Sequence, residues 1–239
     1  MVEKFRVAVP HGALAAMLHT PDTDHPAPLV VACHGLSASK DSEKYRRLAE
    51  ALPAAGLALA RFDFRGCGES SGVEEETTIA SRIEDVDAVL GTLAGHPRLA
   101  PRVGLLGSSL GGFVALHVAA RHPGTPVVTW NAPASLTELA NDDLEEGRGL
   151  GVAFALEYAT GQYALAPRGV GWHLVVHGAA DDVVSLDHAA ALHEAAAEPC
   201  ELIVIAGGDH RFTEPDHRAE AIALSQTWFC RWLGPAPTV

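Results

Sequence analysis

The sequence predicts an α/β fold: a mostly parallel, eight-stranded sheet with helices on both of its faces. Along most of the 239 residues, short apolar runs alternate with longer stretches of helical periodicity. A run such as Leu29–Cys33 is apolar throughout, as expected of a strand that is buried on both faces. With 48% hydrophobic residues, the chain can form one large core.

The expected elements follow one another in an alternating order. The predicted strands are residues 5–9, 13–18, 29–33, 57–62, 103–106, 126–130, 172–177 and 201–206. The first two form an antiparallel hairpin that turns at residues 10–12. The predicted helices are residues 42–55, 78–94, 113–120, 187–197 and 215–233.

One stretch departs from the alternation. Residues 133–168 contain helix-like pieces with glycine breaks and no matching strand. We expect this stretch to be a small cap insertion over the carboxyl edge of the sheet. Residues 1–239 are otherwise predicted to form a single domain.

Composition argues against several classes of partner. The chain has 17 Lys and Arg residues and 30 Asp and Glu residues, which gives a net charge of −13. This charge disfavours binding to nucleic acid and to anionic membranes. No run approaches the roughly 20 apolar residues of a membrane span. The N-terminus has no apolar signal region, which predicts a cytoplasmic location. The four cysteines lack metal-type spacing and no cluster of metal ligands is evident, so neither a metal nor a cofactor is expected.

The motif Gly107-Ser-Ser-Leu-Gly111 lies between a predicted strand and a predicted helix. In this setting Gly-x-Ser-x-Gly is typical of a nucleophile elbow, a tight turn that lifts the serine hydroxyl above the sheet. A side chain two residues before or after the serine would collide with the neighbouring chain. Ser109 is therefore the candidate nucleophile, and Ser108 is expected to point elsewhere.

Two further polar motifs follow later strands of the same predicted sheet. Asp181 and Asp182 come after residues 172–177, and His210 comes after residues 201–206. Ligands of open α/β sheets bind at loops that follow the carboxyl ends of strands. The chain order serine, aspartate, histidine is the one found in sheet-based hydrolases with a nucleophile elbow.

These motifs together resemble the α/β-hydrolase superfamily, from about residue 5 to residue 233. Within it the chain is most similar to small bacterial carboxylesterases, including the feruloyl- and cinnamoyl-esterase-like and serine-aminopeptidase-like branch. One departure is Cys67, where many relatives carry histidine. The segments that carry the resemblance are His34–Lys40, Arg61–Ser70, Gly107–Gly112, His177–Val184 and Gly208–His210.

The resemblance implies an α/β-hydrolase fold with a catalytic triad. Ser109 would attack an acyl carbonyl, and His210 would accept its proton and pass it to the leaving group. An aspartate would orient the imidazole and stabilise its charged form. The His-Gly-x-x-Asp spacing of the family favours Asp181 over its neighbour Asp182.

An oxyanion hole needs two converging N–H donors. The amide of Leu110, directly after the nucleophile, is one candidate. The resemblance implies that the amide of Leu36 is the other.

The expected substrate is a small-molecule carboxylic ester or thioester, cleaved through an acyl-enzyme. Trp130, Phe154 and Tyr158 are candidate lining residues of an apolar acyl or aryl site, although they could equally be cap core. A peptidase or amidase is the alternative enzyme, with Glu157 as a possible clamp for a peptide N-terminus. The other alternative is a non-catalytic binding protein with this fold. The chain could be a monomer or a homodimer.

Overall fold

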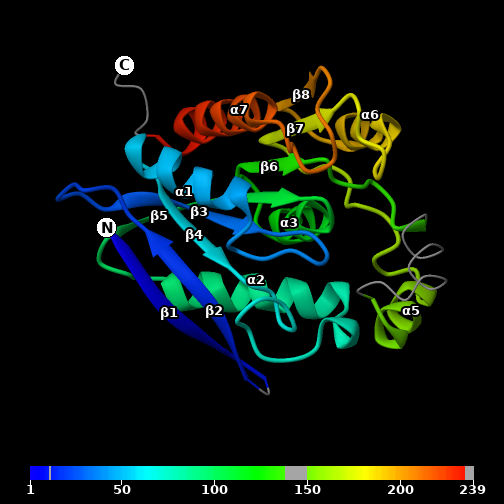
Figure 1. Cartoon of the computed structure of the whole chain (residues 1–239), viewed down its shortest axis with the longest axis horizontal. Coiled ribbons are helices and arrows are strands. Elements are labelled where there is room, and N and C mark those ends of the chain that lie inside the picture. The colour runs from blue at the N-terminus through cyan, green and yellow to red at the C-terminus, as the bar shows by residue number, and fades with distance from the viewer. Residues whose placement is uncertain (11, 138–149, 235–239) are drawn as a thin grey trace.

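An eight-stranded sheet forms the centre of the computed structural model of this protein, which describes residues 1–10, 12–137 and 150–234. The strand order across the sheet is β1-β2-β4-β3-β5-β6-β7-β8 (Figure 1). The strands are β1 (Val2–Val9), β2 (Gly12–His19), β3 (Ala27–Cys33), β4 (Ala58–Phe62), β5 (Leu99–Ser108), β6 (Val127–Trp130), β7 (His173–Gly178) and β8 (Cys200–Ile205). Each overlaps a predicted strand, so the predicted eight-stranded sheet is confirmed.

The sheet is mostly parallel, also as predicted. β2 runs antiparallel to both of its neighbours, β1 and β4. All other neighbouring strands pair in parallel. The reversal is therefore confined to the second strand of the opening hairpin.

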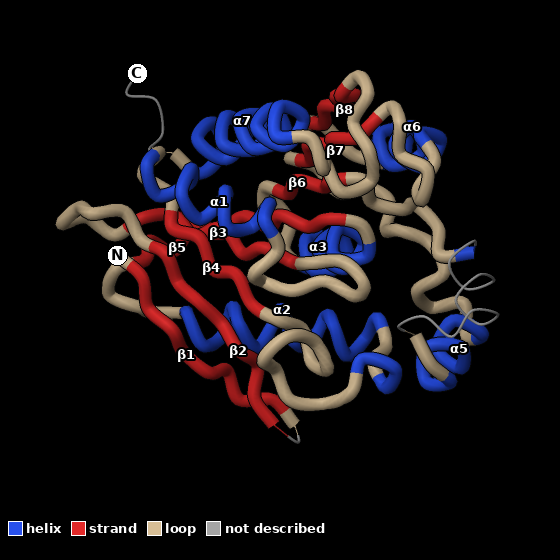
Figure 2. The backbone as a smooth tube through the Cα atoms, in the orientation of Figure 1, coloured by secondary structure: helices blue, strands red, loops and turns tan. Residues whose placement is uncertain are grey.

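Helices cover both faces of the sheet, which gives three layers (Figure 2). Residues of α1 and α7 pack on one face, and residues of α2, α3 and α6 pack on the other. These helices are α1 (Glu43–Ala54), α2 (Ile79–Leu93), α3 (Leu110–Arg121), α6 (Leu186–Ala195) and α7 (Pro215–Leu233).

Strand β3 shows why its sequence is continuously apolar. Leu29 and Val31 pack in the core beneath α2 and α3. Val30 and Ala32 pack in the core beneath α1 and α7. Because successive side chains of a strand point to opposite faces, a strand covered on both sides needs an apolar residue at every position.

The stretch 133–168 adds no strand to the sheet within its described part, residues 133–137 and 150–168. A lone bridge pairs Ser135 with Leu165. Helix α5 (Val152–Ala159) contacts a short 3₁₀ turn, η1 (Glu74–Glu76), near the start of α2 (Figure 1). Residues 138–149 lie outside the described residues. The interpretation of this stretch as a cap stays a prediction.

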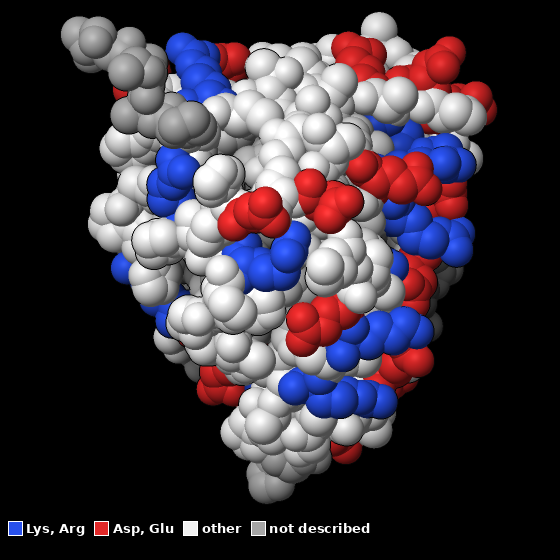
Figure 3. All heavy atoms as spheres, turned by 90° about the vertical axis from the view of Figure 1, so that its left-hand side faces the viewer, with Lys and Arg blue, Asp and Glu red and all other residues white. Residues whose placement is uncertain are grey.

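The surface mixes charges of both signs. On the face shown in Figure 3, Lys and Arg side chains lie interspersed with Asp and Glu. Among the described residues, no helix combines the length and the apolar character needed to cross a bilayer.

Packing between α7 and the sheet leads to a test at Gly104. A Cβ atom there would lie 2.7 Å from Cε1 of Phe229 and 3.0 Å from Cδ1 of Leu233. We expect Gly104→Ala to lower the free energy of unfolding by about 1–3 kcal/mol through overpacking. In the control Gly91→Ala, the new Cβ in α2 meets nothing within 4 Å, and higher helix propensity should add up to ~1 kcal/mol. Urea unfolding followed by circular dichroism measures both, and a Gly104→Ala protein as stable as the wild type would contradict the packing argument.

Candidate active site

Ser109 lies at the turn between β5 and α3, with a backbone φ of +54° and ψ of −131°. Side-chain-bearing residues rarely adopt such a conformation, which costs about 1–3 kcal/mol and persists only where the surroundings impose it. Here the Ser109 amide donates to the carbonyl of Trp130 at 2.8 Å, and its carbonyl accepts from the amide of Gly112 at 2.8 Å. The turn is thus fixed on both sides of the serine.

The glycines of the motif provide the clearance that this turn needs. A Cβ atom on Gly107 would collide with the backbone of Gly111, and one on Gly111 would collide with the carbonyls of Cys33 and His34. Both collisions involve backbone atoms, which cannot move aside cheaply. The steric reason inferred from the sequence therefore matches the geometry of the turn.

Ser109, His210 and Asp181 form a continuous chain of hydrogen bonds. Nε2 of His210 lies 3.1 Å from Oγ of Ser109, and Nδ1 lies 2.8 Å from Oδ2 of Asp181. The Asp181 side chain has no exposed surface, whereas that of His210 is 15% exposed. Because a carboxylate only accepts, Nδ1 carries the hydrogen and Nε2 is left as an acceptor facing the serine hydroxyl.

Asp181 is held as a carboxylate. Burial raises the pKa of Asp181, but hydrogen bonds from His210 and from the amides of Val184 and Val183 outweigh burial and lower that pKa overall. These amides donate to Oδ1 at 2.8 and 2.9 Å. Asp182 is exposed, so the structure brings Asp181, and not its neighbour, to the histidine.

The loop after β3 lies directly against the serine turn. A Cβ atom on Gly35 would lie 3.0 Å from Cβ of Ser109. The ring of His34 holds this loop: Nδ1 donates to the carbonyl of Gly35 at 2.7 Å, and Nε2 accepts from the amide of Phe64 at 3.0 Å. Burial lowers the pKa of His34 to about 4, so the ring is neutral. The predicted oxyanion donor Leu36 follows in this loop.

Comparisons with known proteins bear on the fold and the family of this chain. The family model of serine aminopeptidase, S33, matches residues 24–141, and that of the Uncharacterised protein family (UPF0227) matches residues 83–225. The structure of Est1E from Butyrivibrio proteoclasticus with ferulic acid bound has a TM-score of 0.84 at 20% identity, covering 97% of this chain and 100% of that one. The chain belongs to the Uncharacterised protein family (UPF0227), and it has the α/β-hydrolase fold.

The sequence relatives match this chain over different lengths. A protein of Mycobacterium tuberculosis named "Putative phosphoribosyl transferase" is 31% identical over 237 residues, 97% of this chain and 47% of that protein. The monoacylglycerol lipase of Mycolicibacterium smegmatis is 38% identical over 107 residues, 44% of this chain and 36% of the lipase. The chain thus spans about half the length of the first relative.

Asn131 supports the loop that carries His210, and the sequence analysis did not identify it. Its side-chain amide donates to the carbonyls of Asp209 and His210 at 3.1 and 2.9 Å, and its Oδ1 accepts from the amide of Gly178 at 2.8 Å. The residue is fully buried, with a φ of +49°. It follows β6 directly, and a search of every strand end for polar residues would have found it.

Lys44 is a second residue that the sequence interpretation missed. Its amine, on α1, donates to Oγ of Ser108 at 2.6 Å. Burial and, to a smaller extent, the charge of Arg211 lower the pKa of Lys44 to about 8, although the carboxylates of Asp209 and Asp181 act in the opposite direction. No local sequence signal marks this lysine, because α1 and β5 meet only in the folded chain.

The aromatic candidates separate into two places. Trp130 is fully buried on the α7 side, where Nε1 donates to Oγ of Ser225 at 3.0 Å. Its ring serves the core, and the expectation that it lines the substrate site is not supported. The rings of Phe154 and Tyr158 stack on α5 with their centres 6.2 Å apart, and Phe154 is buried while Tyr158 is partly buried. Their role in substrate binding stays a prediction.

The carboxylate of Glu157, the suggested clamp for a peptide N-terminus, already has hydrogen-bond partners within the protein. Its carboxylate accepts from the amides of Ile79 and Ala80, at the start of α2, at 2.6 and 2.9 Å. Backbone amides at a helix N-terminus stabilise a negative charge. The carboxylate therefore fastens α5 to α2, which removes the feature that the peptidase alternative depended on.

Cys67, the departure from the family pattern, is a buried thiol. Burial raises the pKa of Cys67 to about 12. The thiol is therefore protonated at neutral pH, when only a thiolate is strongly nucleophilic.

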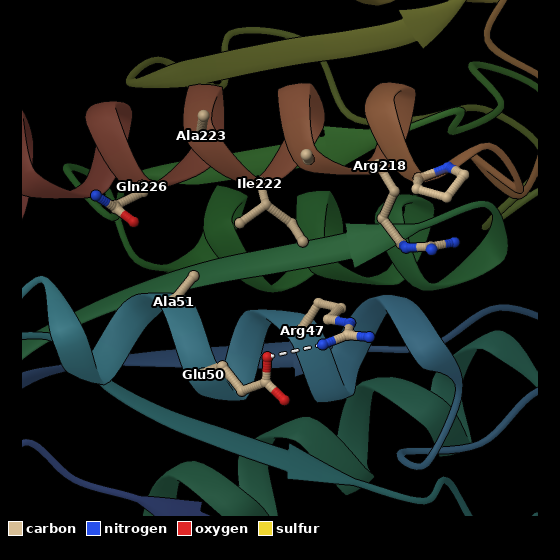
Figure 4. A pocket seen from close by; sticks show the side chains of 9 residues that line it. Arg47, Glu50, Ala51, Arg218, Ile222, Ala223 and Gln226 are labelled. Atoms are coloured by element: carbon tan, nitrogen blue, oxygen red, sulfur yellow. Dashed lines mark hydrogen bonds and ion pairs between the residues drawn. The ribbon is translucent and has the colours of Figure 1, made fainter.

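Two cavities of the described residues lie away from Ser109. A groove of about 580 Å³ separates α1 from α7, where Arg47 pairs with Glu50 at 3.1 Å beside Ile222 (Figure 4). A second cavity of about 680 Å³ is lined mainly by apolar residues of α2, β5 and α3, among them Leu93 and Val103. Neither is lined by a predicted site residue.

The lowered pKa of Lys44 predicts a pH dependence of stability. The unfolded lysine titrates near 10.4, so between about pH 8 and 10 the unfolded state binds more protons and stability rises with pH. We expect wild type to gain free energy of unfolding relative to Lys44→Met between pH 7.5 and 9.5. Urea unfolding at both values measures this, with Lys4→Met, an exposed position on β1, as control. An unchanged difference between wild type and Lys44→Met would contradict it.

Proposed function

We propose that the protein is a serine hydrolase that cleaves a carboxylic ester or thioester through an acyl-enzyme. The observation that carries the proposal is the hydrogen-bonded chain in which His210 lies 3.1 Å from the Ser109 hydroxyl and 2.8 Å from the Asp181 carboxylate. A nucleophile, a base within reach of its proton and a group that orients the base are the parts that acyl transfer requires.

In the first half of the proposed reaction, Oγ of Ser109 bonds to the acyl carbon and its proton passes to Nε2 of His210. The tetrahedral intermediate collapses, the bond to the alcohol or thiol breaks, and His210 returns the proton to that leaving group. In the second half a water molecule attacks the acyl-enzyme, and His210 accepts its proton. The acid is released and Ser109 recovers its hydrogen. Asp181 remains ionised and stabilises the imidazolium throughout.

Developing negative charge on the carbonyl oxygen needs donors that are already in place. We assign this role to the amides of Leu110 and Leu36. Leu110 opens α3, where backbone N–H groups favour an anion. Leu36 follows the Gly35 contact with Ser109. Loss of one such donor typically reduces the rate by ~10²–10³-fold.

The substrate class rests on the relatives and on α5. One sequence relative is a monoacylglycerol lipase, and the structural neighbour Est1E binds ferulic acid. Phe154 and Tyr158 provide apolar rings on α5. We therefore propose a small-molecule ester of an acyl or aryl acid. The engaged Glu157 carboxylate argues against a peptidase, and the intact hydrogen-bonded chain argues against a non-catalytic binding protein.

Covalent labelling tests the nucleophile. We expect a fluorophosphonate to label wild type stoichiometrically and Ser109→Ala not at all, because phosphonylation requires the serine oxygen. Ser108→Ala, which changes the adjacent serine, should still be labelled. Mass spectrometry of the intact protein measures the adduct, and p-nitrophenyl esters beside an aminoacyl anilide test the preference for esters. Folded wild type that resists labelling would overturn the serine-hydrolase proposal.

The two neighbouring aspartates provide a matched pair. Asp181→Asn should reduce kcat by roughly 10³–10⁴-fold, because the amide no longer favours the useful tautomer of the histidine. Asp182→Asn, at an exposed position, should leave kcat nearly unchanged. Steady-state kinetics on one p-nitrophenyl ester measures both. Equal effects, or a larger effect at Asp182, would show that the acid is wrongly assigned.

A further inference from the structure

The loop that carries Leu36 is fixed on its far side by an acidic residue. Ser37, the next residue, has a φ of +47°. Its amide donates to Oε1 of Glu74 at 3.1 Å. The Ser37 N–H belongs to the peptide group that follows Leu36, so its direction determines how the backbone at Leu36 is turned.

Glu74 is itself held by a buried cation. Nη2 of Arg82 donates to the same Oε1 at 3.0 Å and lies 3.2 Å from Oγ1 of Thr77. The Arg82 side chain is 1% exposed and that of Glu74 is 16% exposed. A pair this shielded from water is weakly screened and keeps its geometry better than a surface ion pair.

Burial of the Arg82 guanidinium costs free energy. Its Nε and Nη1 are buried with no hydrogen-bond partner among the described residues. The guanidinium lies 5.1 Å from the centre of the Phe64 ring, which offsets part of this cost. Buried donors without partners lose their hydrogen bonds to water and gain none in return. The favourable contacts that the guanidinium does make are with Glu74, Thr77 and Phe64, and the shortest of them is the ion pair with Glu74.

His34 and Glu74 hold the loop after β3 on either side of Leu36. On one side His34 accepts from Phe64 and donates to the carbonyl of Gly35. On the other side Glu74 accepts from the amide of Ser37. Leu36 lies between the two held peptide groups, and the elbow serine touches the same loop at Gly35.

We propose that Glu74 and Arg82 are positioning residues that hold the amide of Leu36 where the oxyanion of the reaction develops. The inference rests on the proposed function. Glu74 accepts from the loop, and Arg82 keeps its carboxylate in place. Neither touches the substrate.

Separate measurement of kcat and KM tests this role. A displaced oxyanion donor weakens binding of the transition state more than binding of the substrate, so kcat should fall while KM changes little. We expect Glu74→Ala to lower kcat about 10–100-fold, within the range for a lost or displaced donor, with little change in KM. Glu74→Gln, which keeps an acceptor for the Ser37 amide, should restore part of kcat. Glu76→Ala, at an exposed position in the same turn, should match wild type.

A transition-state analogue provides the second measurement. A trifluoromethyl ketone adds to the serine and forms a hemiketal oxyanion, so its affinity should fall with kcat across the Glu74 variants and Arg82→Lys. Affinity for the product carboxylic acid should stay nearly constant. Should Glu74→Ala not fold, Glu74→Asp replaces it, because its shorter side chain draws the acceptor away from Ser37.

The outcomes separate the two proposals. Wild type that neither labels with fluorophosphonate nor turns over esters overturns the proposed function. Active wild type with Glu74 variants of unchanged kcat, or with losses only in KM, overturns the positioning role alone. Equal loss of affinity for the analogue and for the product acid also overturns it.

Discussion

The backbone at Ser109 has a φ of +54°, and its neighbours are shaped to impose that value. Gly107 and Gly111 leave room for chain segments that any side chain would displace, and the carbonyl of Trp130 holds the serine amide. The strain is sustained by the second half of β5 and the first turns of α3, which are buried. Because the turn cannot relax, the hydroxyl stays above the carboxyl edge of the sheet, and the first amides of α3 stay directed at the space beside it.

Around this turn, the other parts of the site sit on loops that buried polar groups hold in place. Asn131 connects the loop of His210 to the end of β7 through hydrogen bonds, and His34 and Glu74 hydrogen-bond to the loop that carries Leu36. Each of these groups is buried or nearly so, and each makes hydrogen bonds to backbone atoms. Such bonds fix a loop more firmly than contacts between mobile side chains, and they allow a site built from four separate loops to be preorganised.

Most of the fold could be predicted from the sequence, because strands covered on both faces are continuously apolar and helices of this type are periodic. Leu29–Cys33 and Thr78–Ala94 are clear examples. The sequence does not determine which side of the sheet some residues face. Trp130 ends β6 and points to the α7 side, away from α5. Glu157 lies in the stretch that was expected to contain helix-like pieces, but its carboxylate binds the start of α2. The sequence around Trp130 and Glu157 does not indicate the direction of either side chain.

The sequence by itself determined the α/β sheet, the glycine-lined turn at Ser109 and the order serine, aspartate, histidine, since these depend on local sterics and on the rule that parallel strands end at one edge. Only the tertiary structure decided which aspartate meets His210, because Asp181 and Asp182 differ in direction and not in chemistry. It also brought Lys44 to Ser108 and Glu74 to Ser37. These partners are 64 and 37 residues apart in the chain, and contacts between such distant residues form only when helices and loops pack in the folded chain.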